Sequence, residues 1–401
     1  MRCHWLLLGA VLLLGAIDVT SSYKVWKLAR ANGNFAFCLY SKVIDEKDAV
    51  GENVFFSPFS ISTALSMTYA GAGSKTADEM CLVLGFCPLS FNVHATFRAT
   101  LASLNSPQAQ YKLALANAAF VNERFTLRPS FTDIMSTYYS AGFSLLDFDN
   151  DPEGAADYIN EWVEDRTNGK IKDLVDADAV IESPLVLVNA IYFKGDWKCQ
   201  FNGGVSTHFH VSDKETIPVK MMSKTATFKY AVNHELQCQI LELPYDGCRV
   251  SMYIFLPLET EGLASLESKL TFNSVTSALA KLRKRRLSVG IPRFDIDKGI
   301  RLKPILSSMG IKRAFIDGKA DFSGITNAEI YVDDVIHKAF INVNETGTEA
   351  AAATAVTFTY LSWTPPVTAQ FLADHPFFFL IRDQTTGSIL FLGRYVNPPD
   401  L

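Results

Sequence analysis

The segment Glu345–Pro366, ETGTEAAAATAVTFTYLSWTPP, combines features that seldom occur together. Its four consecutive alanines favour a helix, whereas the VTFTY run that follows favours a strand. From Thr348 to Leu361 it has no proline or glycine, and its only charged residue is Glu349. Every second residue from Thr348 is small or apolar, so the segment could join a sheet as a strand. A plain exposed loop, ended by the proline pair, is the alternative.

The whole chain has 401 residues, of which 48% are hydrophobic and 20% charged, and its formal net charge is −5. This composition predicts a globular protein with a sizeable core and excludes disordered, collagen-like and coiled-coil chains. The negative charge argues against nucleic acid as a partner. Because no repeat or linker divides residues 21–401, we expect one domain. We also expect the protein to be a monomer. Helical patterns come first and strand patterns later, which predicts an α+β fold.

The amino terminus is typical of a secretory signal peptide. Arg2 and His4 precede or begin an apolar run that continues to Ile17, and small and polar residues follow up to Ser22. The run is shorter than the roughly 20 apolar residues that a bilayer span needs. We therefore expect residues 1–20 to be removed, with cleavage somewhere in 16–22, and a secreted, extracellular protein with no membrane partner. A core helix is the alternative.

Periodicity places the expected elements as follows. We expect helices at 32–43, 57–84, 158–167 and 273–282, with Asn273 as a helix cap, and strands at 113–121, 186–193, 238–243, 249–256, 287–294, 329–345 and 377–395. The mature chain keeps six cysteines. Cys81 and Cys87 are close enough to pair locally, and Cys238 and Cys248 flank a Tyr-Asp-Gly turn, so we expect between zero and two disulfides.

The chain lacks the common signatures of catalysis. It contains no G-x-S-x-G elbow, no H-E-x-x-H motif and no Walker loop. His208 and His210 would share one face of a strand, but no third ligand is near them in the sequence. We predict no enzymatic activity, no catalytic residue, no metal site and no required cofactor.

Several blocks of residues 25–401 resemble the serpin family in the same order. The blocks are 53–67, 160–171, 187–197, 337–345 and 374–381, and Glu345–Pro366 is similar to the reactive-centre loop of that family. The resemblance implies three β-sheets, about nine helices and an exposed loop. It also implies a suicide-substrate inhibitor: a protease attacks the loop, forms an acyl-enzyme, and is trapped when the loop inserts into the main sheet.

The family's usual spacing from Glu345 implies that the cut bond is Leu361–Ser362. A shift of one residue would put Tyr360 before the bond. Phe358, Tyr360 and Trp363 flank this position, so the resemblance implies serine proteases with an apolar primary pocket, of chymotrypsin-, cathepsin G- or elastase-like specificity. A non-inhibitory relative that acts as a binding or carrier protein is the alternative.

The resemblance also implies roles for residues around the loop. The hinge that enters the sheet first comprises Glu345, Gly347, Thr348, Glu349, Ala350, Ala351, Ala352 and Ala353. Gly347 allows the hinge to bend, and Thr348 and the four alanines enter at little steric or desolvation cost, which favours an inhibitor over a carrier. Residues expected to support the closed sheet are Ser57, Ser60, Asn189, His337, Trp197 and Arg293, of which Arg293 could pair with Glu345.

Two further features stay open. A basic run at a predicted helix exit could be a solvated face or a site for a heparin-like glycosaminoglycan; it contains Lys281, Arg283, Lys284, Arg285 and Arg286. Asn344 begins the one N-x-S/T sequon of the chain and could carry a glycan.

Overall fold

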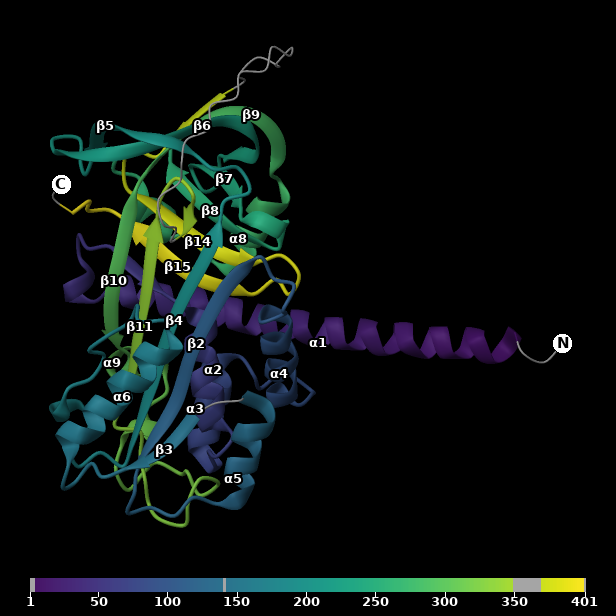
Figure 1. Ribbon diagram of the computed structural model, residues 1–401, viewed down its shortest axis with the longest axis vertical. Coiled ribbons are helices and arrows are strands. Elements are labelled where there is room, and N and C mark those ends of the chain that lie inside the picture. Colours follow the sequence, from purple (N-terminus) through teal and green to yellow (C-terminus); the bar gives the residue numbers. More distant parts are fainter. Residues whose placement is uncertain (1–3, 140–141, 349–368, 400–401) are drawn as a thin grey trace.

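The computed structural model describes residues 4–139, 142–348 and 369–399, and these residues form the expected α+β fold (Figure 1). The helices described are α1 His4–Ile44, α2 Pro58–Tyr69, α3 Ser74–Leu84, α4 Val93–Leu104, α5 Pro129–Ile134, α6 Pro152–Arg166, α7 Leu263–Glu267, α8 Phe272–Ala280 and α9 Lys303–Met309. The strands are β1 Val54–Phe56, β2 Tyr111–Asn122, β3 Gly142–Leu146, β4 Leu185–Asp196, β5 Asn202–His210, β6 Thr216–Asn233, β7 Cys238–Pro244, β8 Val250–Pro257, β9 Arg283–Pro292, β10 Phe294–Arg301, β11 Asp334–Val343, β12 Gly347–Thr348, β13 Ala369–Leu372, β14 Phe377–Asp383 and β15 Ile389–Tyr395.

Within the part of the chain that the structure describes, six strands form the main sheet, in the order β10-β11-β12-β4-β2-β3. Over most of its length β11 pairs directly with β4 in parallel register, from Asp334 opposite Val186 to Phe340 opposite Tyr192. The two-residue strand β12 lies between them at one end only. The centre of this sheet therefore has one parallel pair that a further strand could separate.

The other nine strands form a second hydrogen-bonded network, in which the long strand β6 changes neighbours along its length. Its first half pairs with β5, its last residues pair with β7, and β9 lies on its other side. The expected second and third sheets are joined because β6 belongs to both. One part is β1-β15-β14-β8-β7-β6, and the other is β5-β6-β9-β13.

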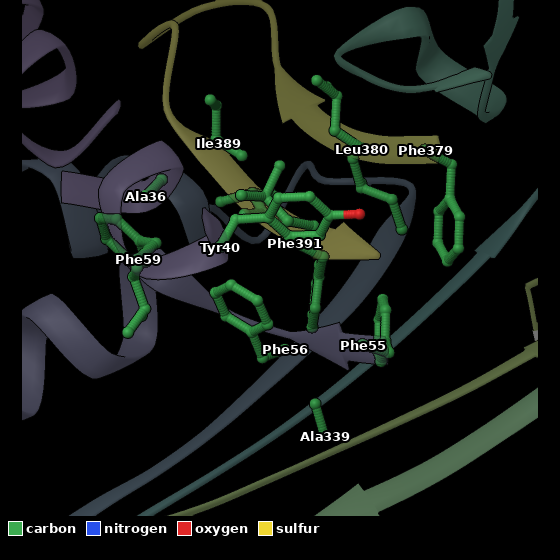
Figure 2. Close-up of a cluster of buried hydrophobic side chains, with 14 of the residues drawn as sticks. Ala36, Tyr40, Phe55, Phe56, Phe59, Ala339, Phe379, Leu380, Ile389 and Phe391 are labelled. Carbon is green, nitrogen blue, oxygen red and sulfur yellow. The ribbon is translucent and has the colours of Figure 1, made fainter. Parts of the chain in front are cut away.

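An aromatic core joins the two sheets and the first helices (Figure 2). Phe55 stacks on Phe391 with ring centroids 5.1 Å apart, and Phe379 lies on its other side at 5.9 Å. Tyr40 of α1 packs against Phe56. All of these side chains are buried, so they hold β1 and α1 against β14 and β15. A smaller apolar cluster lies beneath α6 and fixes that helix over β2 and β4 of the main sheet.

Several boundaries differ from the sequence expectations for local reasons. Thr271, not Asn273, caps α8, because its side chain accepts the Ser274 N–H while Ser274 bonds back in a capping box. Ser57 caps α2 through the Ser60 N–H, as the Ser-Pro pair predicted. The strand expected at 329–345 is confined to Asp334–Val343.

The first helix is longer than the expected segment 32–43, since α1 runs from His4 to Ile44. Within the described ranges, none of the helices has both the length and the apolar character that crossing a membrane requires. Cleavage in 16–22 stays a prediction.

One of the anticipated disulfides is present. Cys81 and Cys87 are bonded, and Cys38, Cys199, Cys238 and Cys248 are free.

Candidate functional site

The hinge residues Gly347 and Thr348 already form a short strand at the entrance of the main sheet. Gly347 faces Asp196 and Thr348 faces Gly195 of β4 in antiparallel register, while Val343 of β11 faces Thr348 on the other side. A Cβ on Gly347 would collide with the backbone carbonyl of Gly195. Only glycine fits this close approach, a stronger requirement than the freedom to bend that the sequence indicated.

Thr348 is held in place by a buried tyrosine. Its side chain is 0% exposed, and its Oγ1 lies 2.7 Å from the Tyr245 hydroxyl. The Tyr245 ring stacks on Trp197 with centroids 4.5 Å apart and meets the edge of Phe193 at 4.9 Å. Burial raises the pKa of Tyr245, so its hydroxyl stays protonated and available for this bond. The sequence did not single out Tyr245; its position in a Tyr-Asp-Gly turn drew attention only to the neighbouring cysteines.

The turn before Thr348 is tied to the sheet through Glu345. Arg293 brings its Nε to 2.6 Å from the Glu345 Oε1, so the contact expected from the resemblance is present. The Gly204 N–H donates to the same oxygen at 2.9 Å. On the other side of the turn, the Trp197 indole N–H donates to the Asn344 carbonyl at 2.9 Å. These bonds hold the Glu345 carboxylate in place and fix the direction in which the chain enters the hinge.

Asn344 itself caps this turn. Its Oδ1 accepts the N–H groups of Thr346 and Gly347 at 3.0 and 3.3 Å, and its Nδ2 donates to Asn342 at 2.9 Å. The residue is half-buried. A glycan on Nδ2 would replace one of its two hydrogens and would have to fit beside the bond to Asn342, so this turn restricts attachment.

A buried polar cluster bridges β4 and β11 farther down the sheet. The Ser57 N–H donates to His337 Nε2 at 3.1 Å, and His337 Nδ1 contacts the side-chain oxygen Oδ1 of Asn189. Asn189 Nδ2 in turn donates to Ser60 and Asn117, and the Ser60 hydroxyl donates to Asn117 at 3.0 Å. The structure thus brings the four expected residues together and adds Asn117.

The protonation state of this cluster follows from its burial. Burial lowers the pKa of His337 to about 3, so the imidazole is neutral near pH 7. Because Nε2 accepts a hydrogen bond from Ser57, the proton of the neutral ring is on Nδ1 and is donated to Asn189. Separation of β4 from β11 would break this bond. Asn117 could have been suspected from its polar side chain within the otherwise apolar strand 113–121.

The basic run has a different setting from the one predicted. Lys281 follows α8, but Arg283–Arg286 lie on β9, not at a helix exit, because the chain pairs there with residues 227–230 of β6. Along a strand the side chains alternate, so Lys284 and Arg286 share one face and Arg283 and Arg285 the other. Leu287, the next residue, pairs with Ala369 of β13. The cations therefore lie beside the strand that follows the loop.

Part of the predicted site falls outside the described residues. These positions are Glu349, Ala350, Ala351, Ala352, Ala353, Phe358, Tyr360, Leu361, Ser362 and Trp363.

Comparison with known proteins identifies the family to which this arrangement belongs. The model of the family "Serpin (serine protease inhibitor)" matches residues 30–398. An uncharacterized serpin-like protein of Thermococcus kodakarensis is 41% identical over 396 residues, covering 95% of this chain and 89% of the relative. The leukocyte elastase inhibitor of Homo sapiens is 38% identical over 383 residues, covering 93% and 100%. The solved structure of human thyroxine-binding globulin complexed with thyroxine superposes with a TM-score of 0.84 at 31% identity, covering 94% and 100%.

The chain belongs to the serpin family.

Proposed function

We propose that the protein is a suicide-substrate inhibitor of serine proteases and not an enzyme. The observation that carries this proposal is the seating of Gly347 and Thr348 between β11 and β4, with the remaining parallel pair still closed. A loop that continues from this start can enter as an antiparallel strand without reversing direction. Its ladder bonds, at about 1 kcal/mol each, favour the inserted state. The closed sheet is then metastable and is held by a kinetic barrier.

The loop sequence supports a target with an apolar primary pocket. We assign the cut bond to Leu361–Ser362, with Tyr360 as the alternative residue before the bond. Chymotrypsin-, cathepsin G- and elastase-like proteases accept such residues, and the loop has no lysine or arginine for a trypsin-like enzyme. The name of the human leukocyte elastase inhibitor is in keeping with this class of target.

The amino terminus supports secretion after cleavage in 16–22. The cations of β9 beside β13 support a site at which a heparin-like glycosaminoglycan could bridge inhibitor and protease. Retention on a heparin column that falls with salt, and that is lost when Lys284 and Arg286 are changed to alanine, would test this site. A glycan on Asn344 would have to be carried by an amide whose oxygen already caps the hinge turn.

The decisive experiment is incubation with chymotrypsin, cathepsin G and elastase. We expect a complex that survives SDS and boiling, with the loop cut after Leu361 or Tyr360 by mass spectrometry. Quantitative cleavage of the loop without such a complex would refute inhibition.

A carrier function is the second candidate, because a cavity of about 230 Å³ lies between α1, α8 and the β14–β15 turn. Trp26 and Phe272 supply aromatic walls, and Arg30 and Arg382 supply two guanidinium groups. Among the described residues neither arginine has a carboxylate within 4.0 Å. A small aromatic anion suits such a lining. Thyroxine, which thyroxine-binding globulin holds in its solved structure, is the ligand to test. Calorimetric titration compares its binding to the wild type and to Arg382→Ala. Equal heats for both proteins would reject the carrier function.

A further inference from the structure

Three asparagines of the chain are followed directly by glycine: Asn32, Asn168 and Asn202. Asparagine is a thermolabile residue, and before glycine it can lose its side-chain amide without an enzyme. The glycine nitrogen attacks Cγ of the asparagine, the bond from Cγ to Nδ2 breaks, and the displaced nitrogen leaves as ammonia with the proton of the glycine N–H. Water then opens the succinimide ring that has formed, so a carboxylate replaces the amide. Glycine favours this attack because it has no Cβ and its backbone bends freely.

Two of the three pairs are held in ways that oppose the attack. Asn32 lies within α1, where the helix fixes the backbone, and it is only 3% exposed. The Gly169 N–H, which must give up its proton, donates to the Glu164 carbonyl at 2.8 Å. The Asn168 side chain is also engaged, because its Oδ1 accepts a hydrogen bond from Lys112 at 2.6 Å. Local opening would have to precede deamidation at both places.

The third pair has a different setting, at the start of β5. Asn202 and Gly203 are both exposed. The register with β6 shifts between the pairs Asn202–Ser223 and Val205–Met221, so two residues of β5 lie opposite one residue of β6 in a β-bulge. Apart from its chain neighbours, no heavy atom of the described residues lies within 4 Å of the position that a Cβ on Gly203 would take. The side chain and the backbone therefore have room to close the ring.

The residues on either side of this pair hold the hinge. The Phe201 N–H donates to the backbone carbonyl of Glu345 at 2.8 Å. The Gly204 N–H donates to the side-chain Oε1 of the same residue at 2.9 Å. Asn202 and Gly203 connect these two donors and set the distance between them. The pair that is open to deamidation is thus the spacer between two bonds that hold Glu345.

Deamidation would change both the length and the charge of this spacer. When water opens the succinimide on its other side, the main chain runs through the former side chain of Asn202, which is an isoaspartyl linkage. The linkage adds one carbon atom to the backbone between Phe201 and Gly204, so their N–H groups no longer match the two oxygens of Glu345. It also adds a carboxylate two residues before Gly204, and a second negative charge near Glu345 is unfavourable.

We propose that Asn202 is a site of spontaneous deamidation, with water as the only co-reactant, and that its conversion loosens the hinge. The reaction requires no enzyme, so the converted fraction grows with the age of the molecule. The inference goes beyond the proposed function and does not depend on it, because it concerns only the bonds to Glu345.

The first test is peptide mapping of the full-length protein by mass spectrometry after incubation at mildly acidic and mildly alkaline pH. The peptide with Asn202 should exchange NH2 for OH and should show an isoaspartyl linkage by electron-transfer fragmentation. Conversion should be faster at the higher pH, because base removes the proton from the attacking nitrogen. Asn32 and Asn168 are internal controls and should be at least about tenfold less converted. Failure of Asn202 to convert, or equal conversion at all three asparagines, would overturn the site.

The second test measures the hinge itself. The isoaspartyl form is separated by anion exchange, and hydrogen exchange of the amides of 344–348 is compared with that of the unmodified protein. We expect about 3- to 10-fold faster exchange in the isoaspartyl form. Asn202→Ser cannot form the succinimide, so after the same incubation its hinge should exchange at the rate of freshly prepared Asn202→Ser. Equal exchange in the two wild-type forms, or faster exchange in incubated Asn202→Ser, would overturn the effect on the hinge.

Discussion

Replacement of Tyr245 by phenylalanine isolates the bond that seats the hinge. The ring would remain stacked on Trp197, so the aromatic packing is retained. Only the hydroxyl that lies 2.7 Å from Thr348 Oγ1 is lost. Because Thr348 is completely buried, its hydroxyl would be left without this partner.

The expected magnitude follows from that burial. Loss of one partner in a buried pair costs about 1–3 kcal/mol, and we take about 1.5 kcal/mol because the threonine hydroxyl can rotate. The hinge should then open roughly tenfold more often. Opening exposes the amides of residues 344–348 to solvent, so their hydrogen exchange should be about tenfold faster by mass spectrometry.

Tyr253→Phe is the matched control. Tyr253 is also buried and accepts a hydrogen bond from Gln384, but it lies on β8. It should leave exchange at the hinge unchanged. If Tyr245→Phe changed the exchange of residues 344–348 by less than about twofold, or if both variants changed it equally, Tyr245 would not be the residue that seats Thr348.

Three further results are expected. The pKa of His337 is about 3 in the fold and about 6.5 in the unfolded chain, so the free energy of unfolding should fall by up to about 1.4 kcal/mol per pH unit as the pH drops from 6.5 towards 3. Urea midpoints at pH 7.5 and 5.5 measure this fall. The same pH dependence in His337→Gln would contradict the assignment to His337. Thr348→Arg should leave cleavage of the loop intact but abolish the SDS-stable complex, because burial of a charge at this fully buried site has a large free-energy cost. A complex that persists on gels would show that this residue does not enter the sheet. Replacement of both Cys81 and Cys87 by serine should cost about 2 kcal/mol and lower the melting temperature by about 2.5 °C; calorimetry that finds no shift would mean that the bridge constrains nothing in the unfolded chain.

The sequence predicted an element correctly where the signal lay in a few adjacent residues or extended along the whole element. The Ser57-Pro58 start and the β-rich run 186–193 correspond to α2 and β4. Boundaries that depend on competition between neighbouring residues were less predictable. Thr271 and Asn273 are both good caps, and the reciprocal bond with Ser274 decides between them. The basic run was placed at a helix exit, but its pairing with β6 is a long-range contact that periodicity cannot reveal.

The candidate site likewise contains residues that were predicted and residues that were missed. The family resemblance implied that Ser57, Asn189 and His337 would meet, and their hydrogen bonds place them in one cluster. Asn117 and Tyr245 were missed because each owes its position to a partner distant in the chain.

The position of β14 and β15 has a practical consequence for a molecule that has been nicked. Both strands are completely enclosed by β1 and β8 in the larger sheet, and their side chains are almost all buried. A cut after Leu361 would leave a carboxyl-terminal peptide of forty residues that contains no cysteine. Gel filtration should therefore report a single particle of unchanged mass, and the small peptide should separate only in detergent or strong denaturant.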